Sequence, residues 1–94
     1  MEENFCIAAF RSRQQVMAFE KVLRMSGISS SIVTTPRAVA IGCGLSVRFE
    51  EKDMSRVRQL YQQHQPGNLI GFYSVEQAGP GRATVRAVPR QPRI

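Results

Sequence analysis

A cysteine between two glycines is the feature of this chain best suited to chemistry. Gly42, Cys43 and Gly44 come directly before residues 45–49, where apolar and polar side chains alternate as in a strand. The glycines leave the sulfur without side-chain cover and allow backbone angles that other residues resist, so another molecule can come close. Exposed cysteines in positive surroundings are reactive, whereas buried ones are inert. Cys43 is therefore either a reactive thiol or a small packing residue under a tight turn.

Other residues make weaker candidates for chemistry. Cys6 lies in an apolar run and His64 is the one histidine, so the close paired spacing of a zinc site is missing. The acidic cluster at residues 50–53 is typical of a solvated helix start. We expect His64 on the apolar face of a helix, and a pair of Cys43 with His64 stays open. We expect no metal and no cofactor.

Length and charge limit the class of protein. The chain of 94 residues suits one domain, has no apolar run long enough to span a membrane, and begins with acidic residues, unlike a signal peptide. We therefore expect a cytoplasmic protein with free thiols. Of the net charge of +6, residues 79–94 carry +4, because they hold four arginines and no acid, together with three prolines. We expect a domain of residues 1–78 and a flexible basic tail of residues 79–94, with room for a short strand at 83–88.

Periodicity divides the domain into alternating elements. Strands are predicted at residues 5–10, 28–34, 45–49 and 69–75. A first helix begins at Ser12, with Gln15 as its capping-box partner, and ends at Gly27. A second helix begins at Asp53 and stops at Pro66-Gly67. This order predicts a ferredoxin-like α+β sandwich, in which two helices cover one face of a four-stranded antiparallel sheet. The other face is also apolar, so we expect another subunit or the tail to cover it.

The predicted topology places the Cys43 loop beside the start of the first helix. The first and second strands run in the same direction, so the loop after the second strand emerges where the first helix begins. The turn Pro66-Gly67-Asn68 is expected at the same edge. Free amides and partial positive charge at the helix start favour a thiolate, as do nearby arginines. The residues expected to shape this loop or to bind an anion are Thr35, Pro36, Arg37, Gly42, Gly44, Arg11, Ser12 and Arg13.

Three short motifs carry a resemblance to a known family. Thr35-Pro36-Arg37, Cys43-Gly44-Leu45 and Arg48-Phe49 resemble the sulfur/selenium carrier-like family of small bacterial proteins, formerly a domain of unknown function. The resemblance covers about residues 5–75. The chain departs from the family pattern at Gly42, where members tend to have serine. It implies that Cys43 accepts sulfur or selenium as a persulfide or selenyl sulfide.

Such a carrier is not a self-sufficient enzyme, because it needs separate donor and acceptor proteins as partners. The alternative function is a binding or regulatory module of the same fold, with no covalent step. Such a module would work through the positive rim, which is the edge with Arg11, Arg13 and Arg37, or through the apolar sheet face. That face could also join copies of the chain into a homo-oligomer. We do not expect nucleic acid as a partner, since residues 45–49 offer Ser46 and Arg48 where an RNA-binding sheet presents exposed rings.

Overall fold

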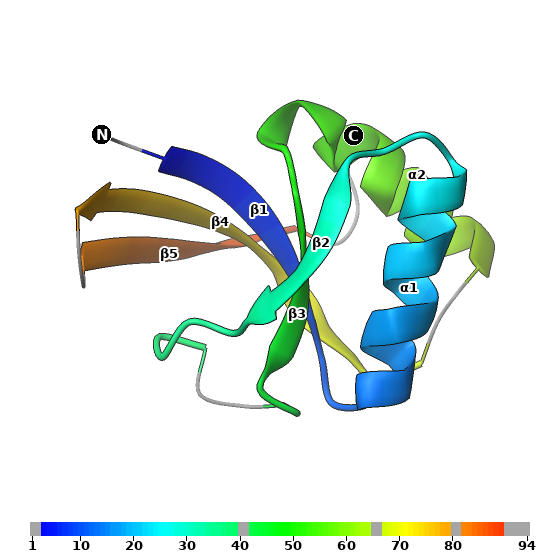
Figure 1. The fold of residues 1–94 in the computed structure, drawn as a ribbon, viewed down its shortest axis with the longest axis horizontal. Helices are drawn as coiled ribbons and strands as arrows, with labels where there is room; N and C mark the ends of the chain where they lie inside the picture. The colour runs from blue at the N-terminus through cyan, green and yellow to red at the C-terminus, as the bar shows by residue number, and fades with distance from the viewer. Residues whose placement is uncertain (1–2, 40–41, 65–66, 80–81, 90–94) are drawn as a thin grey trace.

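Two helices lie on the same side of a five-stranded antiparallel sheet (Figure 1). The computed structural model describes residues 3–39, 42–64, 67–79 and 82–89. The elements in chain order are β1 (Glu3–Phe10), α1 (Arg13–Met25), β2 (Ser30–Thr34), β3 (Leu45–Phe49), a 3-10 turn (Glu51–Asp53), α2 (Met54–His64), β4 (Leu69–Gly79) and β5 (Arg82–Val88).

The strands are arranged in the order β2-β3-β1-β4-β5, and every neighbouring pair is antiparallel. The predicted number of four strands is therefore wrong, because β5 pairs along β4 and adds a fifth. Residues 82–88 form this strand, and the short strand that the sequence analysis allowed at 83–88 within the basic tail is therefore present. Strand β4 itself continues to Gly79. The ferredoxin-like classification and the division of the chain into residues 1–78 and 79–94 stay predictions.

Strand β1 lies at the centre of the sheet, and its residues 5–10 are buried on both faces. Cys6, Ala8 and Phe10 belong to the core on the helix side. Helix α1 covers this core with Val16, Phe19 and Leu23, the stripe expected from helical spacing. Helix α2 contributes fully buried Val57 and the partly buried Leu60 and Tyr61. Because β1 is enclosed on both sides, its backbone is a rigid reference for the loops that touch its end.

A second, smaller apolar cluster lies on the face of the sheet away from the helices. Its buried members are Phe5, Ile7 and Val75, and the partly buried Val33, Tyr73 and Val85 pack against them. Val85 comes from β5, so part of the predicted tail helps to cover this face. Cover by another subunit stays a prediction.

Two details of the helix ends differ from the prediction. Ser12 stands at the N-cap of α1, but its side chain makes no capping hydrogen bond, so the predicted capping box with Gln15 is not formed. His64 ends α2 and is exposed, whereas it was expected on the buried face. The predicted stop at Pro66 lies outside the described residues.

Candidate functional site

Three segments that are far apart in the sequence meet where β1 ends. The amide of Cys43 donates a hydrogen bond to the carbonyl of Phe10 at 3.2 Å, and the amide of Arg11 donates to the carbonyl of Asn68 at 2.8 Å. In Figure 1 the segment leading into β3 accordingly lies beside the turn from β1 to α1, at the lower edge of the view. The Cys43 loop, the start of α1 and the entry to β4 therefore share one edge of the sheet.

Gly42 is wedged between this edge and β4. Its φ is +119°, and a Cβ atom there would lie 2.6 Å from Cδ1 of Ile70 and 2.8 Å from the carbonyl oxygen of Phe10. Real Cβ atoms do not approach other atoms so closely, so glycine is required both for the backbone angle and for space. Gly44 also has a positive φ, +87°, but the space around it is open. Of the two glycines beside Cys43, Gly42 is the one that packing demands.

The base of the loop is closed by Thr35. Its amide donates to the carbonyl of Gly44 at 2.9 Å, and its hydroxyl shares a hydrogen bond of 2.7 Å with the hydroxyl of Ser46. Ser46 is 0% exposed, so its hydroxyl needs such a partner. Beyond Thr35 the chain turns, with the amide of Val39 bonded to the carbonyl of Pro36 at 2.9 Å. Thr35 thus joins the two ends of the loop, and Pro36 begins the turn within it.

The sulfur of Cys43 is half-buried. Its thiol donates to the carbonyl of Leu45 at 3.6 Å, and the side chain packs against the edge of the helix-side core. The residue is therefore neither fully open to solvent, as the flanking glycines suggested, nor enclosed beneath the turn. The core and the Leu45 carbonyl therefore hold the side chain in place.

Cys6, the other cysteine, is in a contrasting environment. It is 1% exposed, and both cysteines are free. Burial is the main cause that raises the pKa of the Cys6 thiol from 9.0 to about 11. The negative charge of Glu51 adds to this rise in pKa, and the positive charge of Arg58 opposes it. At neutral pH Cys6 is thus a protonated thiol inside the core, and Cys43 is the less buried of the two thiols.

Three of the arginines expected at the site lie in two different segments. Arg11 and Arg13 flank Ser12 at the start of α1, and Arg37 lies in the turn that follows Pro36; all three arginines are exposed. The first turn of α1 carries no acidic residue. The hydrogen bond of the sulfur goes to a backbone carbonyl and not to these arginines. The start of α1 therefore presents positive charge from Arg11 and Arg13, whereas Arg37 lies in the loop after β2.

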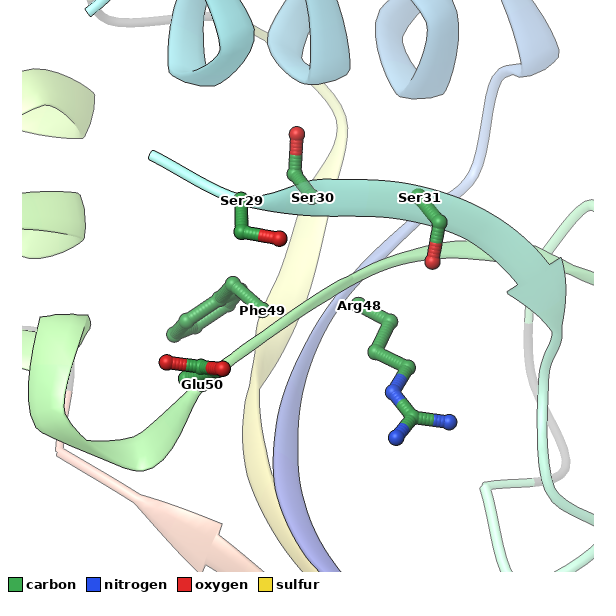
Figure 2. Close-up of a pocket in the computed structure, with 6 residues that line it drawn as sticks. All are labelled: Ser29, Ser30, Ser31, Arg48, Phe49 and Glu50. Atoms are coloured by element: carbon green, nitrogen blue, oxygen red, sulfur yellow. The ribbon is translucent and has the colours of Figure 1, made fainter. Parts of the chain in front are cut away.

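A separate polar hollow of about 180 Å³ lies at the other end of β2 and β3 (Figure 2). Ser30 points toward α1 and bonds to the carboxylate of Glu20 at 3.1 Å, whereas Ser31 and Arg48 point to the opposite side. The guanidinium of Arg48 lies 4.0 Å from the centre of the Phe5 ring. In the pairing of β2 with β3, Ser30 lies opposite Phe49 and Thr34 opposite Leu45, so the hollow is separated from Cys43 by the length of the hairpin.

The acidic cluster at residues 50–53 includes the 3-10 turn, and one of its carboxylates pairs with a neighbouring lysine. Glu50 and Lys52 make an exposed ion pair of 3.2 Å beside the 3-10 turn. Across the described part of the chain, no three His, Cys, Asp or Glu side chains gather as they would around a metal ion.

No helix among the described residues is long and apolar enough to cross a membrane.

Comparison with known proteins identifies the family. The structure is that of an α+β protein with one half-buried thiol in a loop between two glycines. The family model described as "Putative Se/S carrier protein-like" matches residues 5–77, so the chain belongs to that family. Strand β5 lies beyond the matched residues. No curated protein and no solved structure matches the chain in the other two comparisons.

Two contributors to the site were not foreseen from the sequence, and a third was. The Phe10 carbonyl is a backbone group, which carries no signature in the sequence. Ser46 was expected on an exposed face but is buried, and its hydroxyl is bonded to that of the partly buried Thr35. The turn that contains Gly67 and Asn68 was expected at this edge, and Asn68 there adopts a positive φ of +66°, a conformation that asparagine tolerates better than most residues.

The two glycines beside Cys43 allow a matched test of the loop. Gly42→Ala should lower the free energy of unfolding by about 2–4 kcal/mol, because it adds a clash to the backbone strain. Gly44→Ala should cost about 1–2 kcal/mol, since it adds strain in open space. Urea denaturation of both variants measures the difference. Equal losses would contradict the close approach of Gly42 to Phe10.

The raised pKa of Cys6 predicts a pH dependence of stability. Below pH 9 the thiol is protonated in both states, so its contribution is complete. As the pH rises from 9 to about 11, the unfolded chain loses the proton before the folded chain does, and stability is lost. Urea denaturation across this range should show a shallower decline for Cys6→Ala than for the wild type. Identical slopes would show that Cys6 is not buried as described.

Proposed function

We propose that this chain carries sulfur or selenium on Cys43, as a persulfide or a selenyl sulfide. The observation that supports the proposal best is the contrast between the two cysteines, in a chain that belongs to a carrier-like family. Cys6 is closed inside the core, whereas Cys43 is half-buried in a loop anchored to the end of β1. A carrier needs one thiol that a donor can reach. It also needs no second thiol close enough to react with the carried atom.

The loading step is a thiol exchange in which no net oxidant is needed. The thiolate of Cys43 attacks the outer sulfur of a donor persulfide, a new bond forms between Sγ and that sulfur, and the S–S bond of the donor breaks. The donor leaves as a thiolate and takes up the proton that Cys43 releases. The outer sulfur thereby moves from donor to carrier, and the donor thiol is regenerated.

The surrounding residues suit this step in distinct ways. The bond of the Cys43 amide to Phe10 holds the backbone in place, while the bond of the thiol to the Leu45 carbonyl can be released as the sulfur reacts. The exposed Arg11 and Arg13 attract an anionic donor or persulfide to this edge. Free thiols persist in a reducing compartment, so we also propose a cytoplasmic location.

A second role, a binding module without covalent chemistry, is favoured by one observation. The Cys43 side chain packs against the helix-side core, which a purely structural cysteine would also do. In that role the sulfur fills space at the edge, and the positive rim or the apolar sheet face is the working surface. The two roles differ in whether the folded protein takes up sulfur.

The test is loading of the folded protein with a small persulfide. After incubation with glutathione persulfide and removal of excess reagent, the peptide that contains Cys43 should gain the mass of one sulfur atom. Dithiothreitol should remove it. Cys6→Ala should load as the wild type does, and Cys43→Ser should not load. Parallel incubation with selenodiglutathione tests selenium, with a selenyl sulfide on Cys43 as the expected product.

Two outcomes would contradict the carrier role. One is a wild-type protein that stays unmodified while its fold, measured by circular dichroism, is intact. The other is equal loading of Cys43→Ser, which would place the sulfur elsewhere. The first outcome would leave the binding module as the better explanation of the site.

A further inference from the structure

The structure restricts how a carried atom can leave Cys43, because it places the second thiol of the chain out of reach. A second cysteine close to a loaded one could attack it and form an intramolecular disulfide. The chain has two cysteines, so Cys6 is the one candidate for that reaction. Whether it can act depends on the distance between the two residues.

That distance follows from the position of both residues along β1. Cys6 and Phe10 are four residues apart in one strand, and a strand rises roughly 3.3 Å per residue, so they are separated by about 13 Å. Cys43 is level with Phe10, because its amide bonds to the Phe10 carbonyl at 3.2 Å. The pairing of β1 with β3 agrees with this separation, since Cys6 lies opposite Phe49, six residues beyond Cys43 in the chain.

A disulfide joins residues whose Cα atoms lie roughly 4.4–6.8 Å apart. Cys6 and Cys43 are much farther apart than this. Cys6 itself is 1% exposed and is held in the central strand by pairing with both β3 and β4. Bringing the two sulfurs together would require β1 to leave the sheet.

We infer that sulfur carried on Cys43 is handed only to a thiol of another molecule, never to Cys6. The inference rests on the proposed carrier function and adds the class of reaction that must consume the loaded protein. It also means that the loaded form does not discharge itself, so the carried atom is retained until a partner thiol arrives.

The consuming reaction has two balanced forms. In the first, an acceptor thiolate attacks the outer sulfur, the bond from that sulfur to Sγ breaks, and Cys43 leaves as a thiolate that takes the proton of the acceptor. In the second, the acceptor attacks Sγ, expels hydrosulfide and forms a mixed disulfide. A second thiol of the acceptor must then attack that disulfide, which restores Cys43 and oxidises the acceptor dithiol by two electrons while the carried sulfur is reduced. The acceptor is thus a single thiol for transfer or a dithiol for release.

The separation of Cys6 and Cys43 is tested on the unloaded wild-type protein, so this test does not depend on whether loading succeeds. The folded protein is oxidised with diamide in the presence of glutathione, and its disulfides are mapped by mass spectrometry. We expect a mixed disulfide of Cys43 with glutathione and no link between Cys6 and Cys43. Oxidation in guanidinium chloride, where the fold no longer separates them, should produce that link and serves as the positive control. A Cys6–Cys43 disulfide in the folded protein would overturn the inference.

The chemical part is tested on protein loaded with glutathione persulfide. Without added thiol, the wild type and Cys6→Ala should retain their sulfur equally, and addition of dithiothreitol should release it as hydrosulfide, trapped with monobromobimane. Release from the wild type but not from Cys6→Ala, without added thiol, would overturn the inference. A failure to load at all would instead contradict the carrier function, and the diamide oxidation would still decide whether the two thiols can meet.

Discussion

The approach of Gly42 and Cys43 to the carbonyl of Phe10 is the contact on which the site depends. It ties a loop of the β2–β3 hairpin to the end of the central strand, and it is possible because residue 42 has no Cβ. The anchor works because β1 is buried on both faces and cannot shift without disturbing two apolar clusters. The position of the Cys43 sulfur is therefore determined by the rigidity of the core, although the residue itself lies in a loop.

The same strand separates the two thiols of the chain. Cys6 lies midway along β1 under the helices, where burial keeps it protonated, and Cys43 lies at the end of β1, where it is half-buried. A single structural element thus gives one cysteine a packing role and leaves the other accessible. For a carrier this separation is useful, because a nearby second thiol would compete with the acceptor for the carried atom.

Much of this arrangement could be predicted from local sequence patterns. Alternation predicted β3 at its observed bounds, and helical spacing predicted the buried stripe of α1 at Val16, Phe19 and Leu23. These patterns report burial on one face of one element, which the sequence encodes directly. The direction of the first two strands then placed Cys43 near the start of α1, in agreement with its bond to Phe10.

The remaining features depend on contacts between distant segments. Strand β5 carries arginines and follows a proline-containing stretch, so it was assigned to a tail, yet pairing with β4 and packing of Val85 bring it into the sheet. Likewise, Gly42 and Gly44 are equivalent in the sequence, and only the positions of Phe10 and Ile70 distinguish them.

The most direct measurement of the central claim is the mass of the protein purified without reductant from the cells that produce it. If Cys43 is a carrier, a fraction of the molecules should exceed the mass of the sequence by one sulfur or one selenium atom. Peptide mapping should place that atom on Cys43, and a reductant should remove it. A Cys43 peptide found wholly unmodified, in cells supplied with sulfur and selenium and lysed without thiols, would contradict the carrier function.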